Sequence, residues 1–385
     1  MKHIIFLISS IFLAVSCKQQ SKLAIDVRDV DYINKSDVTL KGFQVDAQWP
    51  LGMLDITVCD SFLIVKTQGK GPRMHVYSDD YDYLGPYCFI GHAGNEFISS
   101  ASMPSKQIFK TADGKTLIPL IDSGRGHKVM DLLQSLKSKS TVITRQNDFT
   151  VEKVFTIKDG KGIYTLGVDF DYVFLDNDIS HTFQLYNPVV EYGKVLLEPS
   201  CAVMYDTLCV KSIKLWNHFD KDDENYINGR LYKHPGRNLI IDPLTDMDYI
   251  FFFDLDNDRN FAIHQSGSPS FDNKPEPVIE REFTLPDGQI IYEYKHTLHF
   301  MGFACTDSFF MVLYFAGDYS TQVPDSDEAV PELLIFDWDG NFLKSARLDT
   351  RITNIGYDER KQILYGLDYT NDRIISFDLS TIMTD

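Results

Sequence analysis

Short runs of strand-forming residues dominate this sequence and limit the folds that it can adopt. Most runs are four to eight residues long and rich in Val, Ile, Phe, Tyr and Thr, with Gly, Asp, Asn and Pro between them. Asp-Gly pairs begin at Asp113, Asp159, Asp287 and Asp339. Such pairs suit hairpin turns because Gly, and to a lesser degree Asp, accepts a positive φ. Many short strands with regular turns predict an all-β protein, either a sandwich, a barrel or a propeller.

One segment has the spacing of an amphipathic helix. Val129, Met130, Leu132, Leu133 and Leu136 recur at intervals of three and four residues, so they could line one side of a short helix. Elsewhere few apolar residues recur at helical spacing, so the prediction of an all-β fold is unchanged.

A repeated six-residue pattern distinguishes between these β folds. Residues 251–256, 334–339 and 375–380 each contain apolar strand residues, then Phe-Asp, one apolar residue and a turn residue. The Asp positions are 83 and 41 residues apart, and because 83 is about twice 41 we expect a degraded copy at 290–294. Residues 75–79 have a similar shape. A period of about 40 to 45 residues is typical of four-stranded, antiparallel propeller blades, so the repeat predicts a β-propeller.

Two segments of the chain resemble a known family. Segment 55–97 ends in the glycine-rich turn 89–97, and segment 333–379 contains Ile335-Phe336-Asp337-Trp338-Asp339-Gly340-Asn341. Together they resemble the TolB-like six-bladed β-propeller lipoproteins of Bacteroidetes, although Ala93 and Asn95 depart from the usual form of the turn. The resemblance implies a propeller outside the cytoplasm and carries over no catalytic residue. We expect six blades, with seven as the alternative.

A propeller ring usually closes by pairing a strand from one terminus with the blade at the other, which protects the edges of the sheet. In this chain a strand near residues 39–43 is suited to complete the blade formed by residues 333–379.

The first seventeen residues predict the cellular compartment. A basic start at residues 1–3 precedes the apolar segment 4–15, which would span roughly 18 Å as a helix, against about 30 Å for the core of a bilayer. Residues 1–16 are therefore expected to be a signal peptide. Residues 13–17, Leu-Ala-Val-Ser-Cys, resemble a bacterial lipobox, so Cys17 is the expected lipidation site. The alternative is ordinary secretion with cleavage near Ser16.

Cleavage before Cys17 would leave residues 17–36 as a lipidated tether and residues 37–385 as a single propeller domain. The protein would then be attached to the bacterial cell envelope through its lipid, and we expect the outer membrane, with the periplasmic or surface face undecided. The formal net charge of −18 argues against nucleic-acid binding, which needs a basic face to displace counterions.

The cysteines fit an exported protein without fixing a disulfide. Apart from Cys17 the chain has Cys59, Cys88, Cys201, Cys209 and Cys305, and an odd number leaves at least one thiol unpaired. Cys201 and Cys209 flank a predicted hairpin tip, so a disulfide between them is one option. The other is that they are buried thiols in strands.

One acidic cluster has the oxygen spacing of a calcium loop. It consists of Asp254, Asp256, Asp258 and Asn260. A complete EF-hand loop needs Gly at its sixth position and Glu at its twelfth, where this chain has Arg259 and Gln265. We therefore expect a polar hairpin turn, with Asp254, Asp256 and Asp258 as weak metal candidates, and no cofactor.

No motif of a known catalytic class is present. The sequence contains no P-loop, no Gly-x-Ser-x-Gly and no His-Glu-x-x-His. We therefore favour a non-enzymatic module that binds a protein or glycan partner at a rim or in the central funnel. The rival hypothesis is a carbohydrate hydrolase or lyase, which would place two carboxylates beside exposed aromatic side chains in the funnel. A third option is a structural role without a defined pocket.

Overall fold

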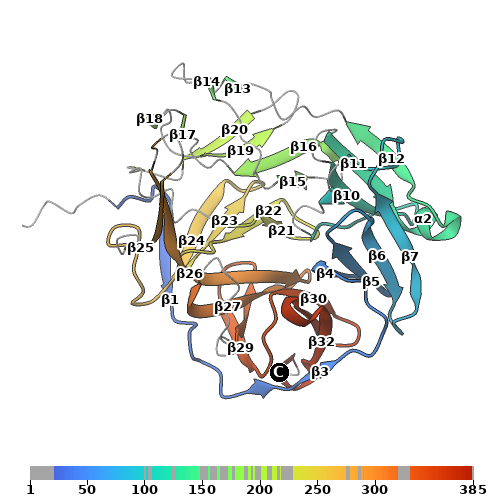
Figure 1. Ribbon diagram of the computed structural model, residues 1–385. Coiled ribbons are helices and arrows are strands. Elements are labelled where there is room, and N and C mark those ends of the chain that lie inside the picture. Colours follow the sequence, from blue (N-terminus) through green and yellow to red (C-terminus); the bar gives the residue numbers. More distant parts are fainter. Residues whose placement is uncertain are drawn as a thin grey trace, which may run out of the picture.

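The computed structural model describes most of the chain. The described residues are 21–98, 101–102, 106–122, 126–147, 217, 229–274, 278–284, 288, 290–319 and 330–383, together with short strands between residues 155 and 214. The strands form sheets arranged around a central axis, as the ribbon shows (Figure 1). The fold is therefore an all-β propeller with four-stranded antiparallel blades.

The first three blades are formed by strands between residues 53 and 214. Blade 1 contains β4 (Met53–Cys59), β5 (Phe62–Thr67), β6 (Pro72–Ser78) and β7 (Tyr83–Phe89). Blade 2 contains β8 (Ala101–Ser102), β9 (Phe109–Lys110), β10 (Thr116–Asp122), β11 (Gly126–Asp131) and β12 (Ile143–Asn147). Blade 3 contains β15 (Tyr172–Leu175), β16 (Asp178–Leu185), β19 (Cys201–Tyr205) and β20 (Val210–Lys214). Two small hairpins accompany them, formed by β13 (Phe155–Thr156) with β14 (Ile163–Tyr164) and by β17 (Val190–Glu191) with β18 (Lys194–Val195).

The next two blades gain additional strands at their edges. Blade 4 contains β21 (Tyr232–Lys233), β22 (Leu239–Pro243), β23 (Tyr249–Asp254) and β24 (Arg259–Gln265), and β1 (Asp26–Val30) pairs in parallel with β24. Blade 5 contains β26 (Ile290–Cys305), β27 (Phe309–Tyr319), β28 (Glu332–Asp337) and β29 (Phe342–Leu348). In blade 5, β25 (Val278–Thr284) extends one edge, and β2 (Thr39–Leu40) pairs in parallel with β29 at the other.

Both ends of the described chain contribute to the remaining sheet, which we call the closing sheet. It contains β30 (Asn354–Asp358), β31 (Ile363–Asp368), β32 (Arg373–Asp378) and the N-terminal β3 (Gly42–Gln44). Among the described residues, consecutive strands therefore form five blades. The prediction of six such blades, with seven as the alternative, is corrected, because the last three strands have no fourth strand of their own and take β3 instead.

The closure differs in detail from the expected one. β3 pairs antiparallel with β32, so that Gly42 lies opposite Phe377, and Figure 1 shows the C-terminus beside β3. A side chain at position 42 would not fit without a shift, since its Cβ would lie 2.6 Å from Cγ2 of Ile375. The predicted strand at 39–43 is therefore confirmed in its second part, but β2 joins blade 5.

The Phe-Asp repeat marks equivalent strands. Asp254, Asp337 and Asp378 end β23, β28 and β32, each of which is the third strand of its sheet. The predicted copy at 290–294 is wrong, because those residues begin β26 and pair with β25. The 83 residues between Asp254 and Asp337 therefore separate the same strand in two adjacent blades. This distance is longer than the 41-residue spacing because β25 is inserted between blades 4 and 5.

The repeated Asp is explained by the turn that follows each strand. Asp337 Oδ1 accepts hydrogen bonds from the backbone N–H groups of Asp339 at 3.0 Å and Asn341 at 2.8 Å. In the same way Asp254 Oδ1 accepts from Asn257 N at 3.1 Å. Such carboxylates satisfy turn donors that have no partner in the sheet ladder.

Helices are few and short in the described chain: α2 (Leu132–Ser138), the 3-10 turn η3 (Tyr369–Asn371) and α3 (Ser380–Met383). The helix predicted from residue 129 begins at Leu132, because Asp131 caps it by accepting a hydrogen bond from Gln134 N at 3.0 Å. Val129 and Met130 belong to β11 instead. None of the helices in the described residues is long and apolar enough to cross a membrane.

Aromatic side chains pack neighbouring blades together. Tyr232 of blade 4 stacks on Phe303 of blade 5 with 3.9 Å between ring centroids and 12° between planes. Both rings belong to a buried cluster that also contains Phe252 and Phe310. Stacked pairs of this kind add to the free energy gained from burial of apolar area. The ring is thus held by apolar interfaces between blades as well as by the pairing of β2 with β29 and of β3 with β32.

The N-terminal segment is attached to the propeller from the first described residues. Ser21 Oγ donates to Asp272 Oδ2 at 3.1 Å, and Asn217 Nδ2 donates to Leu23 O at 3.0 Å. β1 lies within residues 17–36, the segment that the sequence assigned to a tether. The tether upstream of residue 21 is outside the described residues.

Candidate functional site

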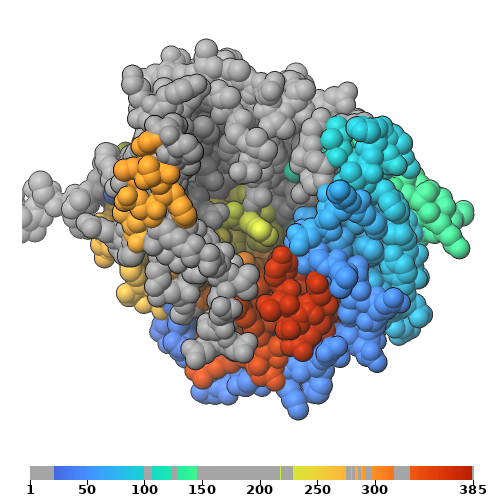
Figure 2. Space-filling model, viewed as in Figure 1, coloured from blue at the N-terminus to red at the C-terminus, as the bar shows by residue number. Residues whose placement is uncertain are grey.

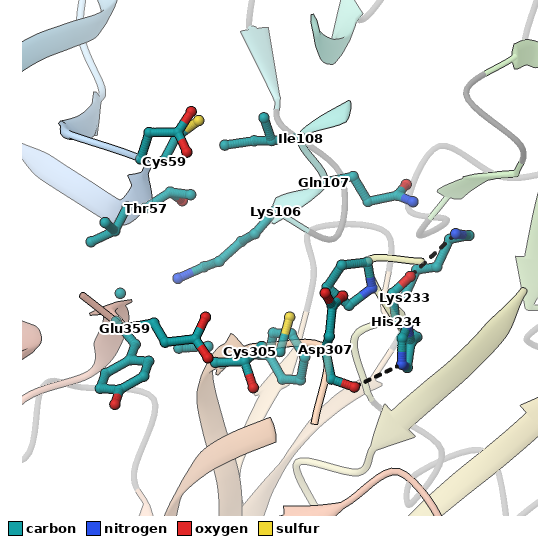
Figure 3. A pocket seen from close by; sticks show the side chains of 18 of the residues that line it. Thr57, Cys59, Lys106, Gln107, Ile108, Lys233, His234, Cys305, Asp307 and Glu359 are labelled. Atoms are coloured by element: carbon teal, nitrogen blue, oxygen red, sulfur yellow. Dashed lines mark hydrogen bonds between the residues drawn. The ribbon is translucent and has the colours of Figure 1, made fainter. Parts of the chain in front are cut away.

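A cavity of about 290 Å³ opens where the first strands of several sheets end. Its lining residues come from blades 1, 2, 4 and 5 and from the closing sheet; they are 57–60, 106–110, 233–235, 303–307, 355–357 and 359. Figure 2 shows a hollow near the middle of one face of the molecule. Figure 3 shows the lining side chains, which no continuous stretch of sequence could bring together.

The ammonium group of Lys106 joins three parts of the ring. Its Nζ donates to the carbonyl oxygens of Ile56 at 2.9 Å and Ile355 at 2.6 Å, and it pairs with Asp55 Oδ1 at 2.8 Å. An ammonium group has three N–H donors, so all three have acceptors. The side chain of Lys106 is 10% exposed, so this amine is a buried link between blade 1, blade 2 and the closing sheet.

The surroundings of Lys106 are rich in positive charge. Burial lowers the pKa of Lys106, and the opposing effect of the Asp55 carboxylate is smaller. Burial also lowers the pKa of Lys66, which lies opposite Asp55 in the β4–β5 ladder. Arg230 adds to the lowering of both pKa values through charge repulsion. Asp55 is therefore the carboxylate that opposes this lowering of the pKa at both lysines.

His234 is a structural link and is poorly suited to act as a base. Its Nδ1 accepts hydrogen bonds from the backbone N–H groups of Gly236 at 2.9 Å and Arg237 at 3.1 Å. The ring proton must therefore be on Nε2, which lies 3.1 Å from Asp307 O and donates to it (Figure 3). Burial, followed by repulsion from Arg237, lowers the pKa of His234 to about 4. At neutral pH this neutral ring ties blade 4 to blade 5.

Two thiols line the cavity in their protonated form. Cys59 and Cys305 are unpaired cysteines, and burial raises the pKa of each thiol to about 12. A thiolate is the nucleophilic form of cysteine, so neither residue is activated for covalent chemistry at neutral pH.

The rim carries carboxylates but little exposed aromatic surface. Lys110 pairs with Asp60, while Asp307 and Glu359 extend from the β26–β27 and β30–β31 turns. The aromatic lining residues Phe109, Phe303 and Tyr357 are 6%, 1% and 8% exposed. These rings do not form the exposed platforms that the carbohydrate-hydrolase hypothesis requires.

A second cavity, of about 320 Å³, lies at the outer edge of blade 4, beside β1. His264 on its wall has Nδ1 3.0 Å from Asp29 Oδ1 and Nε2 3.2 Å from Pro269 O. Both ring nitrogens are thus occupied by protein contacts, and Tyr249 and Phe271 on the same wall are 2% exposed. This edge site offers fewer accessible polar groups than the central cavity.

The residues singled out in the sequence lie elsewhere. Cys17 and Cys209 are outside the described residues, and the side chain of Cys201, on β19, is also outside them, so lipidation and the disulfide remain predictions. Asp254, Asp256 and Asp258 are in the β23–β24 turn, where Asp256 Oδ1 accepts from Asn238 Nδ2 at 3.1 Å. Within the described part of the chain, no three His, Cys, Asp or Glu side chains are placed to hold a metal ion.

The comparisons with known proteins add no functional assignment. No family model matches the chain, and no curated protein matches its sequence. A putative exported protein from Bacteroides fragilis shares 12% identity at a TM-score of 0.47, covering 91% of this chain and 98% of its own. A DUF4221 family member from Bacteroides vulgatus shares 10% identity at a TM-score of 0.48, with coverage of 93% and 96%. A protein of unknown function from Bacteroides thetaiotaomicron shares 11% identity at a TM-score of 0.45, with coverage of 93% and 75%. At these values the likeness carries no argument about function.

Proposed function

We propose that this chain is a lipid-anchored protein of the bacterial cell envelope, at the outer membrane, and that it binds a protein or glycan partner through the central cavity. The lipobox-like end of the leader at Cys17 and the resemblance to TolB-like lipoproteins support the location. The propeller supports the mode of action, because turns at the end of a closed ring can present side chains from several blades to one ligand.

The observation that carries the binding role is the make-up of the cavity. Its volume of about 290 Å³ is at the lower end of the range for ligand sites, which suits one sugar ring or one amino-acid side chain. Lys106 and His234 are occupied by structural hydrogen bonds, and the Cys305 thiol is protonated. Among the described lining residues, these groups offer recognition surface in place of an activated nucleophile.

The rival role, a carbohydrate hydrolase or lyase, would use Asp307 and Glu359 as its acid and base. Both carboxylates line the same cavity, which is the observation in its favour. The buried state of Phe109, Phe303 and Tyr357 removes the exposed aromatic platforms that the hydrolase hypothesis predicts beside the two carboxylates. We therefore place binding before catalysis.

The test compares the protein with a variant whose cavity is filled. Cys59→Met and Cys305→Met together place two flexible, bulkier side chains in the cavity, and Cys88→Ala is the control because Cys88 is buried between blades 1 and 2. Affinity capture from native envelopes should recover a partner with the wild type and Cys88→Ala, and not with the filled variant. Equal capture by all three proteins would refute the cavity as the binding site. Hydrolysis of envelope glycans that Asp307→Asn abolishes would support the rival.

A further inference from the structure

The lysines of the central cavity have acceptors within the protein, whereas two of its carboxylates do not. Lys106 has three acceptors, Lys110 pairs with Asp60, and Lys233 Nζ donates to His234 O at 3.2 Å. No hydrogen bond or ion pair reaches the carboxylates of Asp307 and Glu359 in the part of the chain that the structure describes. Asp307 and Glu359 are therefore the two charged side chains of the cavity that remain open to a ligand, despite its three lysines.

Asp307 and Glu359 both lie near the thiol of Cys305. They follow β26 and β30, two strands that lie side by side in the ring. Both carboxylates contribute to the raised pKa of Cys305 through their charge, so each is within electrostatic range of its sulfur. Figure 3 shows Asp307, Cys305 and Glu359 along one side of the cavity.

A buried hydroxyl group below the rim also lacks a partner. Thr57 lines the cavity from β4 and is 6% exposed, and its Oγ1 has no hydrogen-bond partner. Buried polar side-chain atoms in folded proteins nearly always have a partner, so a water or a polar group of a ligand would satisfy this hydroxyl. The hydroxyl comes from blade 1, whereas the carboxylates come from blade 5 and the closing sheet, so the two observations are independent.

We infer that the cavity binds a compact ligand that carries one ammonium or guanidinium group, held between Asp307 and Glu359, and a second polar group that meets Thr57 Oγ1. This inference rests on the proposed function and names the class of ligand. Charge-assisted hydrogen bonds from a cation to two carboxylates are about twice as strong as neutral ones. The ammonium of Lys106, which is bonded to Ile355 O of the closing sheet, disfavours a second positive charge on the ligand in so small a space.

Two sources in an envelope supply this chemistry: an amino sugar of a glycan and a lysine side chain of a protein. Both present a primary amine beside further polar atoms. The size of the cavity admits either one, so matched probes must separate them.

Titration calorimetry with glucosamine and glucose tests the charge, because the two sugars differ by an amine in place of one hydroxyl. Glucosamine should bind at least ten times more tightly than glucose at neutral pH. The tripeptide Gly-Lys-Gly and its side-chain-acetylated form test the protein source in the same way. The amine form of at least one pair should bind, and the pair that binds more tightly identifies the source.

Three variants assign the binding to the named groups. Asp307→Asn with Glu359→Gln should weaken the amine probe at least tenfold, and Thr57→Val should weaken it severalfold without lowering the melting temperature, because it replaces an unpartnered hydroxyl with a methyl group. Asp80→Asn with Asp82→Asn removes the same charge from an exposed turn and should leave binding unchanged.

The outcomes separate this inference from the proposed function. Preference for a neutral or acidic probe, or no binding of either amine, would overturn the cationic ligand. If the filled-cavity variant still loses its envelope partner in that case, the binding role stands and the ligand class is wrong. Equal loss of binding in the Asp80 and Asp82 control would also overturn the assignment, since it would reflect total charge alone.

Discussion

The ammonium of Lys106 lies 2.6 Å from the carbonyl oxygen of Ile355, a residue 249 positions away in the sequence. The same Nζ pairs with Asp55 at 2.8 Å, so one side chain connects the closing sheet, blade 1 and the start of blade 2. The hydrophobic contacts between blades are spread over many residues, whereas this link depends on a single charge. Its removal should therefore have a large and specific effect.

We predict that Lys106→Met lowers the free energy of unfolding by about 3 kcal/mol, because it leaves a largely buried carboxylate and two carbonyl groups without their donor. Urea denaturation provides the measurement. Lys110→Met is the matched control, since Lys110 and Asp60 are 62% and 44% exposed and such pairs contribute about 1 kcal/mol or less. Adding Asp55→Asn to Lys106→Met should recover part of the loss. Equal effects of the two lysine variants would contradict the role of Lys106 as a link.

The stability of the protein should fall as the pH is lowered from 7 to 4. Burial lowers the pKa of His234 to about 4 from its ordinary value of 6.5, so between these values the unfolded chain binds a proton that the folded ring does not. Folding is then disfavoured increasingly as the pH falls through 6.5, by up to about 3 kcal/mol near pH 4. The contribution of His234 is fully present above pH 6.5.

Denaturation curves at a series of pH values test this dependence. His234→Gln should be less stable than the wild type at pH 7 but should lose less stability between pH 7 and pH 4. His92→Gln, at an exposed position, should follow the wild type. A wild-type slope that persists unchanged in His234→Gln would assign the effect to other groups.

Short-range patterns predicted the fold well because each depends on neighbouring residues. The Phe-Asp motif at Asp337 arises from a strand and its following turn, and the carboxylate needs only the next few backbone N–H groups. The expected copy at 290–294 failed because spacing alone cannot reveal an inserted strand. β3 was predicted as a closing strand within residues 39–43. The structure divides this segment, because β2 pairs with β29 and β3 pairs with β32, and no local pattern predicts pairing with two different sheets.

The cavity could not be predicted from the sequence for a related reason. Asp307 and Glu359 lie in two turns 52 positions apart in the sequence, and neither turn carries a recognisable motif. Their proximity follows from the position of β26 beside β30. The acidic cluster at Asp254 was conspicuous in the sequence, yet Asp254 caps its own turn and Asp256 binds Asn238 of the neighbouring turn.

Closure of the ring by β3 leads to a prediction at Gly42. Gly42→Val would place its Cβ 2.6 Å from Ile375 Cγ2 and should lower the free energy of unfolding by about 1–3 kcal/mol through overpacking. Lys41→Ala, at the adjacent exposed position, should change stability by less than about 0.5 kcal/mol. Thermal unfolding followed by circular dichroism measures both. A Gly42→Val protein as stable as the wild type would show that β3 is not needed for closure.

Asp337, the aspartate of the repeat, should contribute more to the free energy of unfolding than Asp339 in the same turn. Asp337→Ala removes the acceptor for two backbone N–H groups and the Asn341 amide, and should cost about 1–2 kcal/mol. Asp339→Ala in the same turn removes only an exposed pair with Arg259, and should cost less than about 1 kcal/mol. Urea midpoints of the two variants give the comparison, and an equal loss would mean that the repeat marks sequence similarity without a capping role.

Lipid attachment at Cys17 predicts where the protein is found in the cell. Each buried CH₂ of an acyl chain contributes about 0.8 kcal/mol to membrane binding, so several chains on one cysteine hold the protein firmly in the membrane fraction. Cys17→Ser should move it to the soluble fraction or stall its processing, and should abolish labelling by radioactive palmitate. Cys88→Ser is the control, because Cys88 is buried in the propeller and cannot carry a lipid there. Wild-type protein that is soluble and unlabelled would instead indicate ordinary secretion with cleavage near Ser16.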